Sequence, residues 1–367
     1  MANNSSIDTS CFPTSHQLEI IGWVSIGTGG ASLISCILIL FVAILFQKYR
    51  GTTQRVILYL TITVFLNSIL YLLHGIRTIL EGATDSDFCI ALAFLDQVIS
   101  WMEFLAILCL TVDFFVKSVF LKFNTERFEI VYALVIFILP FTFNWVPFLG
   151  NTYGYGGTNC WIKQYKDMNC SETDKLGLAF RFGLYWIPFY IIMTFVIIAY
   201  FISLFKARRR ITQYSATTPT FSEQTIKELL LSEVRQYQLY PFIMIVIFSL
   251  GIISRIAEAV DDGKNFFALR VFHVVVMAIQ GPVIAIVFTM DYDTRKQICN
   301  PRQILTACFG LWCCCRKNRV REYTAIIHEG SFISDPIMTP KQSSSMEEES
   351  LATGSGYITA NKKNEVI

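Results

Sequence analysis

Seven long apolar segments follow one another along the chain, and they constrain its fold more than any other feature. An α-helix of about 20 apolar residues crosses a hydrocarbon core of about 30 Å, and such a helix pairs its backbone polar groups within itself. Only 16% of the 367 residues are charged, whereas a soluble domain carries roughly a quarter. The pattern predicts an all-α membrane protein, a seven-transmembrane helix bundle. The predicted spans are residues 20–46, 56–80, 89–121, 130–149, 176–205, 239–260 and 266–290.

The basic residues indicate how this bundle lies in the membrane. Short cytosolic loops are enriched in Lys and Arg. Here only alternate connections are rich in them, and the tail before the first span has none. We therefore predict the N-terminus outside and the C-terminus in the cytosol. The basic residues that set this orientation include Lys48, Arg50, Arg55, Lys122, Arg127, Lys206, Arg208, Arg209, Arg210, Arg295 and Lys296.

The chain is predicted to have four parts. Residues 1–19 form an extracellular tail, and residues 20–290 form the bundle. Residues 291–315 form a mixed juxtamembrane helix that lies along the inner leaflet and ends in a cysteine cluster. Residues 316–367 are polar and read as a disordered cytoplasmic tail.

Two motifs of this C-terminal part suit regulatory modification. Three adjacent cysteines beside cations are typical of reversible palmitoylation, the alternative being free thiols. Three serines before a run of glutamates are phosphorylation candidates or part of a solvated linker. The cysteines are Cys313, Cys314 and Cys315, and the serines are Ser343, Ser344 and Ser345.

Glycosylation motifs agree with the predicted orientation. Asn3, Asn4 and Asn169 each begin an Asn-x-Ser sequence, and all three fall on the predicted outer side. Such a short motif is weak by itself, so the agreement of all three is what supports the topology.

Four cysteines also fall on the predicted outer side, where an oxidising environment permits disulfides. Cys89 opens the third span, and Cys160 lies in the long second outer loop. A bridge between them would pin that loop over the end of the bundle. Cys11 and Cys170 could form a second bridge, although sequence alone does not determine connectivity.

The sequence contains no motif that predicts catalysis or metal binding. Neither a His-Glu-x-x-His pair nor a phosphate loop ending in Gly-Lys-Ser/Thr occurs, and the four histidines are scattered. A net charge of +2 gives no support for nucleic-acid binding. We therefore expect no enzymatic activity, no cofactor, no metal and no nucleic-acid partner.

Two other membrane classes are disfavoured. Residues 152–156, Thr-Tyr-Gly-Tyr-Gly, resemble a potassium filter, but a filter needs four copies around an axis and a preceding pore helix. A retinal protein needs a lysine in the last span to form a Schiff base, and residues 266–290 contain none.

Ionisable residues within the spans are the main functional signal, because such residues are costly in lipid and tend to face the bundle interior. Arginines converging on an outer cavity would suit an anionic ligand, since a guanidinium presents a planar fork to phosphate or carboxylate. The alternative is internal neutralisation, for example of Arg255 by Glu258 or of Arg77 by Glu81. The candidate ligand-binding residues are Arg77, Glu103, Arg181, Arg255, Glu258 and His273.

Short motifs also occur in a characteristic order along the chain. They are Glu126-Arg127-Phe128-Glu129, Leu139-Pro140, Asn159-Cys160-Trp161-Ile162, Arg181-Phe182-Gly183-Leu184-Tyr185, Pro188-Phe189, Tyr237-Gln238-Leu239, Arg255-Ile256, His273 and Gln280-Gly281. This ordered set, over roughly residues 47–293, resembles the cyclic-AMP-receptor class of G-protein-coupled receptors, to which animal orphan receptors are related.

The resemblance implies coupling to a heterotrimeric G protein through the inner loops and a Cys89–Cys160 bridge. The chain departs from the rhodopsin-like class, which has Asp-Arg-Tyr in the third span and Asn-Pro-x-x-Tyr in the seventh. Here Asp113-Phe114-Phe115 and Gln280-Gly281-Pro282 stand at those places. The switch residues of that class therefore cannot be transferred.

The expected protein is a plasma-membrane receptor whose partners are an extracellular small-molecule ligand, a heterotrimeric G protein and membrane lipids. Ligand binding would favour one arrangement of the helices, and the sixth span, with Pro241 near its cytosolic end, is the expected moving element. The alternatives are a multi-span transporter, although we find no internal repeat of the kind transporters often show, and a seven-span adaptor that signals without G proteins.

Overall fold

The structure is a computed structural model, and it describes residues 13–48, 51–82, 84–120, 128–156, 159–166, 172–216, 238–251, 253, 267–290 and 294–295. Two compact units, Met1–Cys314 and Cys315–Ile367, divide the chain. Every described residue lies in the first unit. The predicted cysteine cluster and cytoplasmic tail lie outside the described residues and stay predictions.

Six helical segments are long and apolar enough to cross a membrane, and they confirm six of the seven predicted spans. The predicted sixth span is described over the apolar helix Gln238–Gly251. Its roughly 14 residues rise about 21 Å, less than a hydrocarbon core of about 30 Å. The seventh crossing and the direction of the bundle in the membrane stay predictions. The six segments are Ser15–Leu45, Thr52–Glu81, Asp87–Val119, Glu129–Gly150, Lys175–Arg209 and Phe267–Met290.

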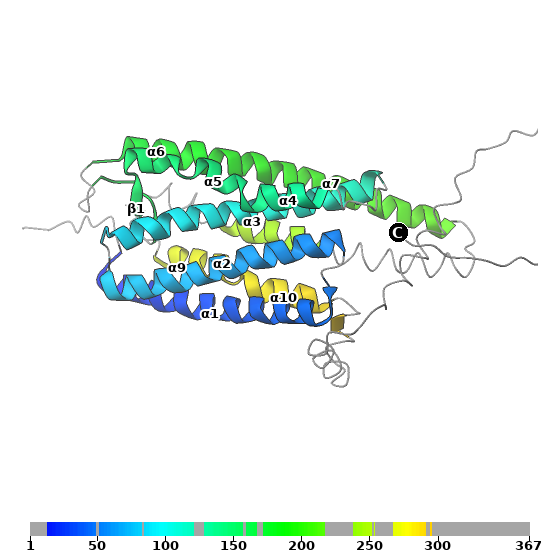
Figure 1. Cartoon of the computed structure of the whole chain (residues 1–367), viewed down its shortest axis with the longest axis horizontal. Coiled ribbons are helices and arrows are strands. Elements are labelled where there is room, and N and C mark those ends of the chain that lie inside the picture. Colours follow the sequence, from blue (N-terminus) through cyan, green and yellow to red (C-terminus); the bar gives the residue numbers. More distant parts are fainter. Residues whose placement is uncertain are drawn as a thin grey trace, which may run out of the picture. The chain divides into compact units, whose positions relative to one another are not determined.

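The third helix is the centre of the bundle (Figure 1). In its most apolar stretch 78% of the residues are buried, against 50% or less in each of the other five segments. It contacts its neighbours in sequence, the fifth span and both strands. The helices around which the bundle is built are α1 (Ser15–Leu45), α2 (Thr52–Glu81), α3 (Asp87–Phe120) and α7 (Ile187–Ala216).

Two of the spans are broken where the sequence has proline. Proline lacks the N–H that a helix needs and clashes with the carbonyl one turn earlier. Pro140 and Pro147 divide the fourth span, and Pro282 follows the interruption at Ile279 in the last span. The pieces are α4 (Glu129–Phe137), α5 (Leu139–Phe143) and the 3₁₀ turn η3 (Val146–Gly150), then α9 (Phe267–Ala278) and α10 (Gln280–Met290).

The fifth span changes its winding near its start. The short helix α6 (Lys175–Phe180) begins where the Asp174 side chain accepts a hydrogen bond from the backbone N–H of Leu176. A π-helical turn, η4 (Arg181–Trp186), follows and continues into α7. Such wide turns are rare, and they often occur at functional sites.

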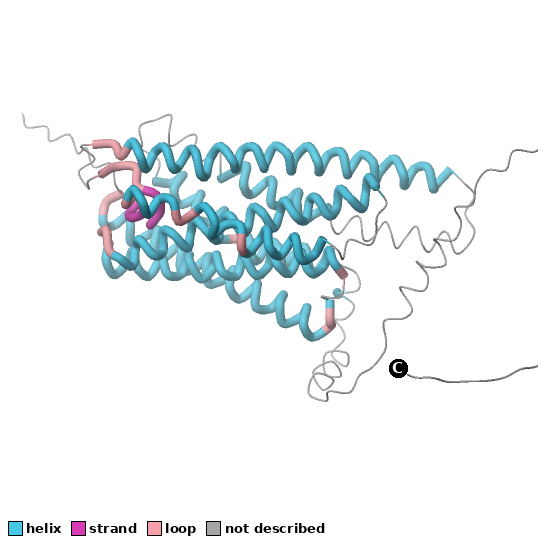
Figure 2. Tube along the Cα trace, turned by 45° about the horizontal axis from the view of Figure 1, so that its top comes forward, coloured by secondary structure: helices cyan, strands magenta, loops and turns pink. Residues whose placement is uncertain are grey.

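A short hairpin lies across one end of the bundle, near the start of α6 (Figures 1 and 2). Strands β1 (Tyr153–Tyr155) and β2 (Cys160–Ile162) pair antiparallel, with Tyr155 opposite Cys160. All six strand residues are buried. We call this end of the bundle the hairpin end; the sequence predicts that it faces outward.

Candidate functional site

A disulfide fixes the hairpin onto the central helix. Cys89, in the first turn of α3, is bonded to Cys160 in β2, and their Cα atoms are 5.3 Å apart. Both cysteines are fully buried. The predicted bridge is thereby confirmed. The predicted pair Cys11 and Cys170 and the three glycosylation motifs lie outside the described residues.

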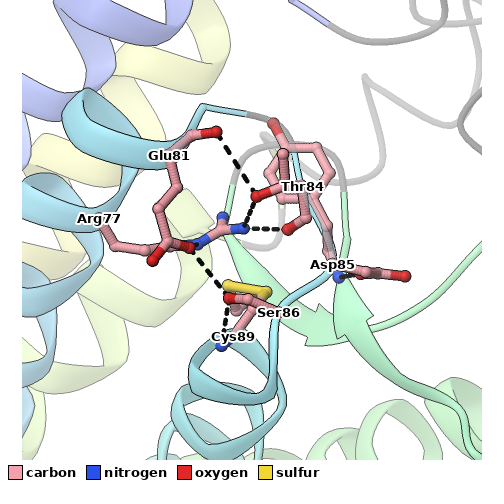
Figure 3. Close-up of polar contacts among 8 residues, drawn as sticks. Arg77, Glu81, Thr84, Asp85, Ser86 and Cys89 are labelled. Atoms are coloured by element: carbon pink, nitrogen blue, oxygen red, sulfur yellow. Dashed lines mark hydrogen bonds and ion pairs between the residues drawn. A yellow bond between two sulfur atoms is a disulfide. The ribbon is translucent and has the colours of Figure 1, made fainter.

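Arg77 joins the end of α2 to the connection that leads into α3 (Figure 3). Its Nε donates to Glu81 Oε2 at 3.2 Å, and its Nη2 donates to the carbonyl and hydroxyl oxygens of Thr84. The guanidinium also lies over the Tyr155 ring, 5.5 Å from its centroid. The side chain is 1% exposed, so this cation is buried with a carboxylate partner.

Glu81 extends the same network to the start of α3. Its Oε2 accepts a hydrogen bond from the Ser86 hydroxyl at 2.9 Å, and that hydroxyl accepts one from the Cys89 N–H at 3.2 Å. A serine in this position satisfies a backbone donor of the first helical turn. The network thus holds α2, α3 and the disulfide in a fixed relation.

Asp85 makes a second attachment between this connection and the hairpin. Its Oδ1 accepts a hydrogen bond from the Tyr155 N–H at 2.6 Å, and its Oδ2 pairs with Lys163 Nζ at 2.7 Å. Gly154 lies beside both Asp85 and Lys163. A Cβ at this position would be 2.6 Å from Asp85 Oδ1 and would also meet the Lys163 side chain. We call these contacts the Asp85 latch.

Tyr155 lies within the electrostatic influence of two arginines. Burial raises the pKa of its phenol, and the charges of Arg77 and of Arg270 on α9 act in the opposite direction. Arg270 was not among the predicted ligand-binding residues. In the sequence, Arg270 stands out only as a basic residue near the end of an apolar segment.

Arg181 holds the hairpin from the side of the fifth span. Its Nε donates to the carbonyl of Ile162 at 2.7 Å, its Nη2 donates to the same oxygen, and its Nη1 donates to Gln164 Oε1 at 3.3 Å. The guanidinium lies 4.9 Å from the centroid of the Trp161 ring. The π-helical turn begins at Arg181, so these contacts with the hairpin form where the helix widens. A ligand contact of Arg181 stays a prediction.

Aromatic side chains form a continuous layer beneath the hairpin, and sequence reasoning had missed them. Trp161 contacts Tyr185 with ring centroids 5.1 Å apart, and Tyr185 contacts Phe104 of α3 at 5.7 Å. Phe104 in turn contacts Phe248 of the helix Gln238–Gly251 at 4.9 Å. We call these four residues the aromatic column. It connects the hairpin to the predicted sixth span.

The other predicted ligand-binding residues lie elsewhere or are not described. Glu103 of α3 is 1% exposed and accepts a hydrogen bond from Asn67 of α2, and it makes none of the hairpin contacts described above. His273 of α9 lies against Gly251, because its Cε1 is 3.6 Å from where a Gly251 Cβ would be. Arg255 and Glu258 lie outside the described residues. The structure therefore brings Arg77 and Arg181 to the hairpin.

Among the residues described, no group of three or more His, Cys, Asp or Glu side chains could hold a metal ion.

At the opposite end, buried charges tie α2 to α3. Asp113 Oδ2 accepts a hydrogen bond from the Thr53 hydroxyl at 2.6 Å and pairs with Lys117 Nζ at 2.9 Å. Further along, Arg55 pairs with Glu129 of α4 at 2.9 Å. Asp113 begins the triplet that stands where the rhodopsin-like class has Asp-Arg-Tyr, and here its charge is neutralised by Lys117 within the chain.

The arrangement of apolar helices, with a disulfide-bonded hairpin over one end of the third, is that of a multi-pass membrane receptor. Squid rhodopsin is a structural neighbour, with a TM-score of 0.57, 14% sequence identity and coverage of 89% of this chain and 94% of that chain. A curated relative, G-protein coupled receptor 1 of Arabidopsis thaliana, is 22% identical over 294 residues, which cover 78% of this chain and 82% of that protein.

The slime mold cyclic AMP receptor family model matches residues 17–319, and the chain belongs to this family. The resemblance found in the sequence is thereby confirmed. Family and fold are those of receptors and not of enzymes.

Proposed function

We propose that this receptor binds an extracellular small anion at the hairpin end and activates a heterotrimeric G protein at the opposite end, in the plasma membrane. The aromatic column is the observation that supports it best. It joins the hairpin, where a ligand from outside would arrive, to the helix Gln238–Gly251. Exposed cations at the end of α7, Lys206, Arg208 and Arg209, would face an acidic partner in the cytosol.

The ligand class rests on the cations at the hairpin end. Arg77 is already neutralised by Glu81, so the argument depends on Arg181, which contacts the hairpin, and on Arg270, which influences Tyr155. An anionic group is the chemistry that guanidinium groups recognise through forked hydrogen bonds. The family's description names cyclic AMP, so cyclic nucleotides are the first ligands to test.

The proposed mechanism is a shift of population between two helix arrangements. A ligand that binds one arrangement better favours it by its difference in affinity. A ligand that displaces Trp161 would change, through Tyr185, the packing of Phe248 on Phe104, and the helix Gln238–Gly251 would then move. Opening at its Pro241 end would expose a groove for a helix of the G protein.

The test is nucleotide exchange on a purified heterotrimeric G protein, with the reconstituted receptor and a panel of cyclic nucleotides and other small anions. We expect one of these to accelerate exchange in a receptor-dependent way. Ligand binding without exchange would favour the seven-span adaptor. Uptake of labelled ligand into receptor vesicles would favour the transporter.

Arg181 provides a matched pair of variants for the ligand class. Arg181→Lys keeps the charge but loses the fork to Ile162 and Gln164, whereas Arg181→Gln loses both. If Arg181 attracts an anion, agonist potency falls more in Arg181→Gln. Potency is compared at equal surface density of an N-terminal tag in intact cells. If the two variants have equal potency, Arg181 makes no contact with an anionic ligand and only holds the hairpin. The same tag tests the predicted orientation.

A further inference from the structure

The side chain of Trp161 is held beneath the hairpin by three kinds of contact. Its indole Nε1 donates a hydrogen bond to Gln97 Oε1 of α3. The guanidinium of Arg181 lies over the ring, 4.9 Å from its centroid. The rings of Tyr185 and Trp186 meet the indole edge to face, with centroids 5.1 Å and 6.3 Å away. A hydrogen bond at one edge, a cation over the face and aromatic rings around it are contacts by which proteins hold a flat heterocyclic ligand.

The amide of Gln97 is satisfied on only one side. The indole N–H is a donor and never an acceptor, so it fixes the amide with Oε1 toward Trp161. Gln97 Nε2 is buried and has no hydrogen-bond partner among the residues that the structure describes, and the residue as a whole is fully buried. A buried donor without an acceptor is costly. This amide is therefore better satisfied by a group that offers an acceptor beside a donor.

The indole can leave this position without breaking the hairpin. Backbone pairing joins β1 to β2, and the disulfide of Cys160 joins β2 to α3; neither involves the Trp161 side chain. The residue opposite Trp161 in β1 is Gly154, which has no side chain to hold the indole. Trp161 is 9% exposed, the most of the three residues of β2. Rotation of its side chain would open a space of the size of the indole between α3 and the fifth span.

We propose that the indole of Trp161 is a built-in occupant of the ligand site, and that a ligand with an adenine-like base displaces it and is recognised by Gln97. Indole and purine are both flat bicyclic rings of similar size, so one fits the space of the other. The base amino group would donate to Gln97 Oε1, and the ring nitrogen beside it would accept from Nε2. A glutamine amide recognises adenine in this bidentate way.

The exchange of partners gives the ligand an advantage over the indole. The indole satisfies one polar atom of the Gln97 amide, whereas an adenine base satisfies both. The proposal rests on the proposed function in one respect, because it takes the ligand to arrive at the hairpin end. It adds which residue reads the base and which side chain must move.

The test is equilibrium binding of radiolabelled cyclic AMP to the full-length receptor without G protein. The competitor is an analogue whose base amino group carries two methyl groups and so has no N–H donor. We expect the wild type to bind the analogue about 5-fold more weakly or worse. Gln97→Met keeps the length of the side chain and loses both polar atoms, so it should bind the two nucleotides equally. A preference that persists in Gln97→Met would be steric and would overturn the proposal, as would equal affinities in the wild type.

A matched pair of tryptophan variants tests the displacement with Gln97 intact. Trp161→Phe keeps a ring but loses the hydrogen bond to Gln97, so the occupant is displaced more easily and cyclic AMP should bind several-fold more tightly. Trp145→Phe is the control, because Trp145 is exposed and its indole N–H donates to the Thr142 carbonyl instead; its affinity should be that of the wild type. Unchanged or weaker binding by Trp161→Phe would show that Trp161 does not compete with the ligand.

These outcomes are distinct from failure of the proposed function. No binding of cyclic AMP by the wild type would overturn the adenine site, yet receptor-dependent nucleotide exchange with another small anion would leave the proposed function intact. Conversely, loss of the preference in Gln97→Met together with tighter binding by Trp161→Phe would support the site even where cyclic AMP produces no exchange.

Discussion

At the scale of single residues, the two contacts of the Asp85 latch differ in value. The ion pair of Asp85 with Lys163 is partly exposed, with side-chain exposures of 37% and 20%, and pairs of this kind contribute about 0–1 kcal/mol. The bond from the Tyr155 N–H satisfies a buried backbone donor, and leaving such a donor unpaired costs about 1–3 kcal/mol. The hydrogen bond should therefore dominate.

Substitutions of Asp85 separate these two contributions. Asp85→Asn keeps an oxygen acceptor for Tyr155 and loses only the charge, so we expect a loss of less than about 1 kcal/mol in the free energy of unfolding. Asp85→Ala loses both contacts and should cost about 1–3 kcal/mol. Thermal unfolding of the purified receptor measures both variants. An Asn variant as unstable as the Ala variant would show that the ion pair dominates instead.

The two tyrosines of β1 predict the response to alkaline pH. Burial raises the pKa of both Tyr153 and Tyr155 above the ordinary value. At alkaline pH the two phenols therefore stay protonated in the folded state while the unfolded chain loses these protons. Stability from this source is complete below a pH of about 10 and falls as the pH rises beyond it. Tm should therefore fall less steeply from neutral to alkaline pH in the Tyr153→Phe/Tyr155→Phe double variant than in the wild type. Parallel curves would contradict the assignment.

Arg77 and Arg181 show how far residues could be predicted from sequence. Their charge within apolar segments marked both as important, and the internal pairing of Arg77 with Glu81 was among the alternatives. The partners of Arg181 could not be predicted, because the Ile162 carbonyl is presented by a hairpin whose position depends on the disulfide. The aromatic column was missed for the same reason, since its members come from four separate elements.

At the scale of elements, the contact of α1 with α2 depends on glycine. A Cβ at Gly75 would lie 2.7 Å from the Gly22 carbonyl oxygen and 3.2 Å from the Ile26 backbone nitrogen. Backbone atoms cannot turn aside as a side chain can. Small residues of this kind allow transmembrane helices to approach closely.

Gly75→Ala should therefore force α1 away from α2. Overpacking of this kind costs about 1–3 kcal/mol, which should appear as a lower Tm. Gly27→Ala on α1 is the matched control, because a Cβ there meets nothing within 4 Å, and its Tm should be unchanged or slightly higher. Equal Tm values for the two variants would show that the helices adjust without cost.

The elements themselves were largely predictable because membrane crossing imposes one length and one composition. The breaks near Pro140 and Pro282 were not predicted, although their cause is local, because proline lacks the N–H that a helix needs. The π-helical turn at Arg181–Trp186 was not predicted either, because it depends on where Arg181 and the aromatic side chains find partners. The predicted sixth span is confirmed as an apolar helix only over Gln238–Gly251.

At the scale of the whole molecule, the aromatic column is the proposed route by which ligand binding at the hairpin end changes the position of the helix Gln238–Gly251. Tyr185 is its central member, because it contacts both Trp161 and Phe104. Aromatic pairs contribute about 0.5–1.5 kcal/mol each beyond their buried area. The Tyr185 ring also contacts Trp101, Trp186 and Phe189, but its two contacts within the column alone are comparable to a typical coupling energy between sites of about 1–3 kcal/mol.

Tyr185→Ala should therefore weaken the coupling more than it weakens ligand binding. We expect agonist-stimulated nucleotide exchange to fall by about 5-fold or more, while the ligand affinity of the receptor measured without G protein changes little. Tyr185→Phe keeps the ring contacts and should stimulate exchange more than Tyr185→Ala. If Tyr185→Ala and Tyr185→Phe stimulate exchange equally, the column only fills space between the helices. If affinity falls as much as exchange in Tyr185→Ala, Tyr185 contacts the ligand itself, and the coupling must run through other residues.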